Sequence, residues 1–211
     1  KLGFIPPDQF SPFAEKCGLI IDIGEWVLEK AASQVKLWNK SFGLHLRVAV
    51  NISPKHLAEK SFVTRLKEIL DEVQVEPNML EIEITEMSMM DQNEDLISKI
   101  HNIKNMGITI SIDDFGTGYS SLSYLKQFPV NALKIDRSFI QNISNEKSGM
   151  AMVAAIIKLA HALNLEVVAE GVEELKELQI LKDHDCKYVQ GYYFSKPLSV
   201  KDFTKKLEEQ N

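Results

Sequence analysis

The sequence has few cysteines and no long apolar run. Its two cysteines, Cys17 and Cys186, lie far apart and are too few for a disulfide framework or a thiolate metal site, so we expect two reduced thiols in a cytoplasmic domain. No apolar run approaches the ~20 residues that cross a bilayer, and no signal peptide opens the chain, although other domains of the full-length protein can still tether it to a membrane. The first residues, Lys1 to Phe4, do not resemble a translation start. We therefore expect a domain whose earlier part is missing from this sequence.

Basic residues and metal-binding histidine motifs are also scarce. The chain carries 24 Lys and Arg against 30 Asp and Glu, a formal net charge of −6. This balance argues against a protein that coats a DNA or RNA backbone, but it does not exclude a small anionic ligand held by metal ions. The histidines show no HxH or HExxH spacing, so we interpret each as structural or exposed.

The chain alternates between helical and strand patterns along its whole length. Six short runs bounded by turn residues are predicted to be strands: 46–51, 80–85, 108–113, 132–135, 166–169 and 188–190. Helices are predicted before and between them, over 6–18, 20–39, 53–73, 94–105, 121–127, 148–163, 172–184 and 200–209. Asp8 is the expected N-cap of the first helix. The expected common face of the second helix consists of Ile23, Trp26, Val27 and Ala31.

Serial βα units with short connections require parallel strands, in either an open doubly wound sheet or a barrel. No GxGxxG turn follows a strand, which weakens the case for a dinucleotide-binding sheet. Acidic residues instead fall at the C-terminal ends of several strands, where a βα barrel gathers its site. We therefore predict a single α/β domain over residues 1–211, with a modified TIM (βα)8-type barrel that lacks about the first two strands.

Polar side chains stand at the end of every predicted strand. In chain order they are Asn51, Glu83 with Glu86, Asp113 with Asp114, Lys134 with Asp136, Glu170 with Glu173, and Gln190. Taken singly, adjacent aspartates can be turn formers, and the glutamates can be the polar face of a half-buried strand. Carboxylates that converge on one barrel rim, however, repel one another unless cations neutralise them. Such oxygen ligands select Mg²⁺, Mn²⁺ or Ca²⁺, and two ions sharing one aspartate suit displacement at phosphorus.

Six stretches resemble the EAL-domain cyclic di-GMP phosphodiesterases. In the order of that family they are VNIS (50–53), EIEITE (81–86), DDFGTGYSSL (113–122), LKID (133–136), AEGVE (169–173) and QGYYFSKPL (190–198). The opening GFIPPDQF also matches the segment that follows the signature of the family. The EAL tripeptide itself, with its metal-binding glutamate, is expected just before Lys1 and is absent from this sequence.

The resemblance implies a modified TIM barrel that hydrolyses the bacterial second messenger cyclic di-GMP to linear pGpG. It implies two Mg²⁺ or Mn²⁺ ions, with Asp113 between them. The metal ligands that it implies are Asn51, Glu83, Asp113, Asp114 and Glu170. Because Ca²⁺ prefers more ligands and activates water less than Mg²⁺, we expect it to bind and to inhibit.

The resemblance also implies roles for residues around the metals. Lys134 is expected at the attacking water or the phosphate, and Glu170 is a candidate base for that water as well as a ligand. Glu86 is expected to anchor the loop 114–121. Gln190 is expected to face the water or the substrate, and Pro197 to lie near a guanine base.

The resemblance further implies a homodimer fused to sensory or GGDEF domains, with no DNA or RNA polymer as partner. A catalytically silent cyclic di-GMP receptor is the alternative function. Silent members of the family lose the acids or the DDFGTGYSS motif, whereas this chain keeps both. A scaffolding barrel would need no carboxylates at its strand ends. Because the first strands are absent, we expect residues 1–211 alone to be poorly soluble, and because the signature glutamate is absent, we expect them to be nearly inactive.

Overall fold

The structure is a computed structural model that describes residues 5–89, 94–118, 125, 127–141, 143–144 and 147–210. The chain forms two compact units. The first unit comprises Lys1–Ile84 and Asn93–Ile108, and the second comprises Thr85–Gln92 and Thr109–Asn211.

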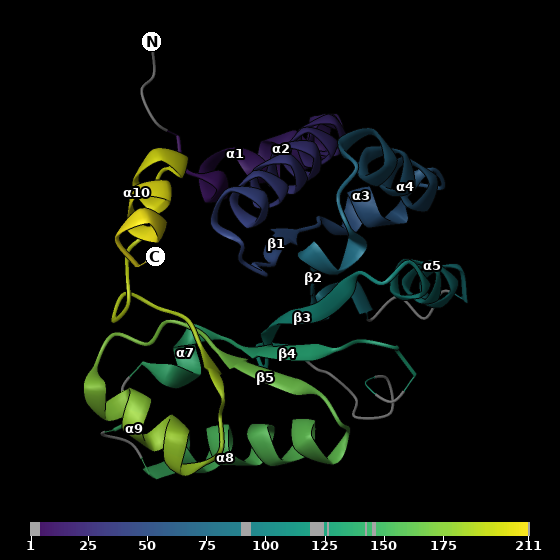
Figure 1. Ribbon diagram of the computed structural model, residues 1–211. Helices are drawn as coiled ribbons and strands as arrows, with labels where there is room; N and C mark the ends of the chain where they lie inside the picture. Colours follow the sequence, from purple (N-terminus) through teal and green to yellow (C-terminus); the bar gives the residue numbers. More distant parts are fainter. Residues whose placement is uncertain are drawn as a thin grey trace. The chain divides into compact units, whose positions relative to one another are not determined.

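The first unit packs helices against two parallel strands (Figure 1). Its helices are α1 (Pro7–Cys17), α2 (Leu19–Phe42), α3 (Pro54–Ala58), α4 (Phe62–Val73) and α5 (Glu94–Asn105), with the 3-10 helix η1 (Pro77–Met79). Its strands are β1 (Val48–Asn51) and β2 (Leu80–Thr85). The register aligns Val48 with Leu80 and Asn51 with Glu83, so the two strands start side by side and β2 continues two residues further. Every residue of β2 except its last is buried, as expected for a parallel strand covered on both faces.

The helix α2 buries a different face from the one that we predicted. Its buried residues are Leu28, Ala32, Val35 and Asn39. They follow the 3.6-residue period of a helix, and Trp26 lies on the other side with 59% of its surface exposed. The prediction was wrong for Trp26 because apolar residues occur on both sides of this helix, so the sequence pattern does not single out one face.

The start of α1 also differs from the prediction. The helix begins at Pro7 with Pro6 as N-cap, because the fixed φ of proline suits the first helical position. Asp8 therefore lies inside the first turn and is not the N-cap. The predicted stop is confirmed, since Gly18 ends the helix with a left-handed φ of 84°.

The second unit is built on four parallel strands in the order β3-β4-β5-β6. These are β3 (Thr109–Phe115), β4 (Ala132–Ile135), β5 (Glu166–Ala169) and β6 (Tyr188–Val189). Its helices are α7 (Arg137–Ile140), α8 (Lys147–Ala162), α9 (Leu175–Asp183) and α10 (Val200–Gln210), with the 3-10 helix η2 (Glu86–Met89). The long helix α8 runs along β4 and β5 (Figure 1). Ile112, Leu133 and Ile135 are fully buried in this unit, so the strands that lead to the candidate site stand on an apolar core.

Most elements match the predicted ranges. The strands β2, β4 and β5 and the helix α5 have the predicted bounds. The predicted helix 53–73 divides into α3 and α4, and the predicted helix 172–184 begins only at Leu175. The short helix α7 was not predicted, whereas the helix expected over 121–127 falls mostly outside the described residues. Over the described ranges, no helix combines the length and the apolar character that crossing a bilayer requires.

Candidate active site

A β-bulge at the end of β3 gives two neighbouring aspartates access to one site. The register between β3 and β4 shifts between Ile112 and Phe115, and Asp114 has a left-handed φ of 55°. Side chains of neighbouring residues alternate between the faces of a regular strand, and a bulge interrupts that alternation. Aspartate is among the few residues that enter the left-handed region readily. The local backbone therefore allows the side chains of Asp113 and Asp114 to reach the same site.

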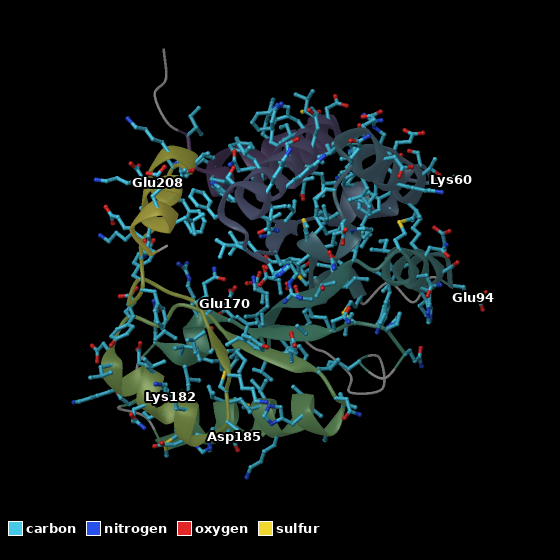
Figure 2. The ribbon with its side chains drawn as sticks, in the orientation of Figure 1. Lys60, Glu94, Glu170, Lys182, Asp185 and Glu208 are labelled. Carbon is cyan, nitrogen blue, oxygen red and sulfur yellow. The ribbon has the colours of Figure 1, made fainter. Side chains whose placement is uncertain are left out.

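Three carboxylates converge at these strand ends. Ligand oxygens of Asp113, Asp114 and Glu170 all lie within 4.8 Å of one another. Asp113 and Asp114 come from β3, and Glu170 directly follows β5, the strand on the far side of β4. Figure 2 labels Glu170 at this position. The arrangement is that of a parallel α/β sheet, in which successive strands deliver side chains to one edge.

A buried lysine from β4 lies between the acids. The Nζ atom of Lys134 is 2.6 Å from Oε1 of Glu170 and 3.4 Å from Oδ1 of Asp113. Only 4% of the surface of Lys134 is exposed. A buried ammonium group is costly unless it is paired, and these two acids provide the pairing. Lys134 thus brings one positive charge into the acidic cluster.

Burial, together with neighbouring negative charge, raises the pKa values of two acids of the cluster. Burial raises the pKa of Glu170, although Lys134 acts in the opposite direction. Burial also raises the pKa of Asp114, and the charges of Asp113 and Asp136 raise it further. One lysine therefore does not neutralise the cluster, and a further cation would favour the ionised carboxylates.

The donor set fits a hard divalent cation. Carboxylate oxygens that can approach one another closely are the ligands preferred by Mg²⁺, Mn²⁺ and Ca²⁺. Asp113, Asp114 and Glu170 supply such oxygens, partly buried. The chain thus has an acidic cluster of the kind that holds a metal ion.

Glu86 contacts the glycine loop that follows the aspartates. Its Oε2 atom accepts hydrogen bonds from the backbone N–H groups of Gly116 at 2.8 Å and Gly118 at 3.4 Å. Glu86 is only 2% exposed, and a Cβ atom at Gly118 would lie 3.0 Å from its Oε1. Glu86 thus contacts the loop at Gly116 and Gly118, and its role as an anchor of the loop stays a prediction. The rest of the loop 114–121 lies outside the described residues.

The other predicted site residues occupy strand ends or an exposed segment. Asn51, the last residue of β1, is the register partner of Glu83 within β2 in the first unit, and both stay predicted ligands. Gln190 follows β6, and its backbone bonds to Ala169 and Val172. Pro197 lies on an exposed stretch before α10, and its role as a guanine contact stays a prediction.

Asp136 belongs to the surroundings of the cluster, although it was not among the predicted site residues. Its negative charge raises the pKa of Asp114, and its side chain accepts hydrogen bonds from both the backbone N–H and the hydroxyl of Ser138. A signal was present in the sequence, because Asp136 stands two residues after Lys134 and so falls on the same side of an extended strand.

The comparison with protein families agrees with this arrangement. A sequence model of the EAL domain matches residues 1–197, so the chain belongs to the EAL domain family. Among curated relatives, the signaling protein YkoW of Bacillus subtilis is 42% identical over 97% of this chain and 26% of its own length. The cyclic di-GMP phosphodiesterase PdeR of Escherichia coli is 41% identical over 95% of this chain and 30% of its own length. The chain thus spans less than a third of these relatives.

Solved structures confirm the predicted fold class. A PaMucR phosphodiesterase in complex with c-di-GMP superposes with a TM-score of 0.92 at 40% identity, over 96% of this chain and 82% of that chain. The EAL domain of DcpA from Mycobacterium smegmatis gives a TM-score of 0.83 at 35% identity, over 88% of this chain and 84% of that domain. The chain therefore has the parallel α/β fold of EAL domains, a partial barrel of TIM type.

Proposed function

We propose that this chain is a metal-dependent phosphodiesterase domain that hydrolyses cyclic di-GMP to linear pGpG. The observation that carries the proposal is the convergence of Asp113, Asp114 and Glu170 around the buried Lys134. The resemblance to PdeR and to the c-di-GMP complex of PaMucR supports the choice of substrate.

The acids would hold two Mg²⁺ or Mn²⁺ ions. Asp113, Asp114 and Glu170 are the proposed ligands in the second unit, with Asp113 shared by both ions. Asn51 and Glu83 are the proposed ligands in the first unit. When bound, the ions supply Lewis acidity that lowers the pKa of a water and stabilises charge on the attacked phosphate.

The remaining residues have proposed roles in proton transfer, charge stabilisation and binding. Glu170 is proposed to accept the proton of the attacking water, because its carboxylate lies beside the other acids of the cluster and next to Lys134. The ammonium group of Lys134 would stabilise the negative charge that builds on the phosphate. Gln190 is proposed to orient the water or the substrate, and Pro197 to border a guanine base.

The test is the hydrolysis of cyclic di-GMP by the full-length protein, with pGpG followed by chromatography in Mg²⁺ or Mn²⁺. Asp113→Asn should lower kcat/KM by at least about 100-fold, or about 2.7 kcal/mol, because it removes a charge from the shared ligand. Asp71→Asn is the matched control, since Asp71 is exposed on α4, and it should leave turnover unchanged.

Two outcomes would count against the proposal. Nucleotide binding without turnover in the parent protein would favour the silent receptor. A loss below about tenfold in Asp113→Asn would exclude its role as the shared ligand.

We also propose a modular, dimeric protein around this domain. The chain covers 29% of the bifunctional diguanylate cyclase/cyclic di-GMP phosphodiesterase MucR and 25% of the oxygen sensor protein DosP, so these relatives contain further regions. By analogy, the proposed partners of this domain are attached sensory or GGDEF domains and a second copy of the protein.

A further inference from the structure

A second buried glutamate binds the backbone of a loop that carries a site residue. Glu177 lies in the first turn of α9 and is 5% exposed. Its Oε2 atom accepts hydrogen bonds from the backbone N–H groups of Glu173 at 2.8 Å and Glu174 at 3.0 Å. These residues close the segment 170–174, which begins with Glu170.

The other backbone contacts of this segment link it to the neighbouring strands. The N–H group of Glu170 donates to the carbonyl of Ile135 at 3.1 Å. The N–H group of Val172 donates to the carbonyl of Gln190 at 3.0 Å, and the carbonyl of Val172 accepts from the N–H group of Tyr193 at 2.9 Å. The segment is thus tied to β4 and to the stretch after β6, and Glu177 binds its remaining end.

The segment 170–174 packs closely against the stretch after β6 that contains Gln190 and Gly191. A Cβ atom at Gly191 would lie 2.1 Å from the carbonyl oxygen of Val172 and 2.3 Å from its nitrogen. Only glycine allows the two backbones to approach in this way. The positions of Glu170 and Gln190 therefore depend on one common backbone arrangement.

The contacts of Glu177 extend beyond an ordinary helix cap. In a capping box, the glutamate at the third helical position binds the N–H group of the N-cap residue, and Glu177 does this at Glu174. It also binds the N–H group of Glu173, one residue further into the loop. Glu86 binds two N–H groups of the glycine loop in the same manner, so each loop that carries a cluster acid is held by one buried carboxylate.

We infer that Glu177 is a positioning residue that holds the segment 170–174, and with it the Glu170 carboxylate, in the geometry needed to bind metal. The inference rests on the proposed function for the identity of the site. Glu177 acts through the backbone of Glu173 and Glu174 and does not itself touch the substrate or the ion.

The experiment measures Mn²⁺ binding to the full-length protein without nucleotide, from the electron paramagnetic resonance signal of free Mn²⁺. Glu177→Leu replaces the hydrogen-bond acceptor by an apolar side chain of similar size. It should weaken Mn²⁺ binding by about tenfold. Glu177→Gln keeps an oxygen that can accept both N–H groups and should stay within about fivefold of the parent. Glu177→Asp keeps the charge but is one methylene shorter, so it should weaken binding by at least about threefold.

The matched control is Ser199→Ala. Ser199 accepts a hydrogen bond from the backbone N–H of Asp202 at the start of α10, so its loss should lower stability without changing Mn²⁺ binding. The inference is overturned if Glu177→Leu is destabilised but binds Mn²⁺ like the parent, as the control does. If Glu177→Leu does not fold, Glu177→Asp decides, and unchanged binding there overturns the inference. A parent that binds Mn²⁺ without hydrolysing cyclic di-GMP would contradict the proposed function and leave this test intact.

Discussion

Asp114 combines a left-handed backbone, which the fold requires, with a negative charge, which only the proposed metal site requires. Asp114 has a φ of 55°, which asparagine and glycine also adopt readily but alanine does not. Its pKa is raised by burial and by the charges of Asp113 and Asp136. A carboxyl whose pKa is raised on folding stabilises the fold at low pH, and this contribution is lost as the pH rises through the folded pKa. The ionised Asp114 therefore destabilises the metal-free protein at neutral pH.

Asp114→Asn should accordingly stabilise the metal-free domain and weaken its metal binding. Because Asp114 is exposed, solvent screening limits the expected gain at pH 7 to about 0.5 kcal/mol. Asp114→Ala removes the same charge but strains the backbone, so it should be about 1–2 kcal/mol less stable than Asp114→Asn. Urea unfolding in EDTA measures both differences. An asparagine variant less stable than the parent would contradict the role assigned to charge repulsion.

At the same scale, the sequence predicted which acids form the cluster, but not the backbone geometry by which the neighbours Asp113 and Asp114 both reach it. The types and strand-end positions of Asp113, Asp114 and Glu170 sufficed to predict that they converge. The bulge could not be predicted, because it depends on the φ of Asp114 and on the pairing of β3 with β4. Asp136 was noted at its strand end but was not assigned to the site. The effect of its charge on the pKa of Asp114 depends on that bulge geometry.

At the scale of elements, the loop after β3 depends on its contact with η2. Glu86→Gln replaces a charged acceptor by a neutral one, and this change costs about 1 kcal/mol in total, because only the bond to Gly116 is short. We expect about a fivefold rise in the Mn²⁺ concentration that gives half-maximal activity. Glu209→Gln is the control, since Glu209 is exposed on α10 and its ion pair with Lys205 lies at the surface. An unchanged metal requirement in Glu86→Gln would exclude the anchoring role.

The contact between α2 and α3 predicts a pH-dependent stability. His56 of α3 is 2% exposed, and its Nδ1 atom has no hydrogen-bond partner among the described residues. A Cβ atom at Gly24 of α2 would lie 2.3 Å from Nδ1, so the packing leaves no room for water there. Burial lowers the pKa of His56 from its ordinary value of 6.5, against the opposing charges of Glu25 and Glu59.

His56 therefore takes up a proton near pH 6.5 in the unfolded chain, but only at a lower pH in the folded chain. The free energy of unfolding should fall as the pH decreases below about 6.5, by at most about 1.4 kcal/mol per pH unit from this group. In His56→Gln this contribution should disappear. Urea unfolding at pH 7.5 and pH 5.5 compares the two proteins, and an equal pH dependence in both would show that His56 is not the responsible group.

The helices and strands were predictable where the hydrophobic pattern of the sequence matches the residues that are buried in the structure. The strands β2, β4 and β5 are short segments rich in apolar or β-branched residues, most of them buried, and α5 has a clear amphipathic period. The exposed Trp26 shows the limit, because an apolar residue marks a buried face only when a neighbouring element packs against it. The four-residue helix α7 is too short for a periodic signal.

At the scale of the whole molecule, metal binding should be linked to folding. A ligand that binds only the folded state stabilises it by about 2.7 kcal/mol when present at 100 times its Kd. For a domain of this length, such a gain should raise the Tm by about 5–10 °C. Because the cluster carries more acid than Lys134 neutralises, both Mn²⁺ and Ca²⁺ should produce the shift.

Turnover should distinguish the two ions. Ca²⁺ is larger, prefers more ligands and activates water less than Mg²⁺ or Mn²⁺. We therefore expect Ca²⁺ to raise the Tm of this domain in the full-length protein, to support nucleotide binding and to inhibit hydrolysis. Thermal unfolding and pGpG formation are measured in EDTA, Mn²⁺ and Ca²⁺, with Asp113→Asn as the variant that should lose most of the thermal shift. Rapid hydrolysis in Ca²⁺ alone would contradict water activation by the smaller ions. An equal Tm in all three solutions would show that the acidic cluster does not hold a metal.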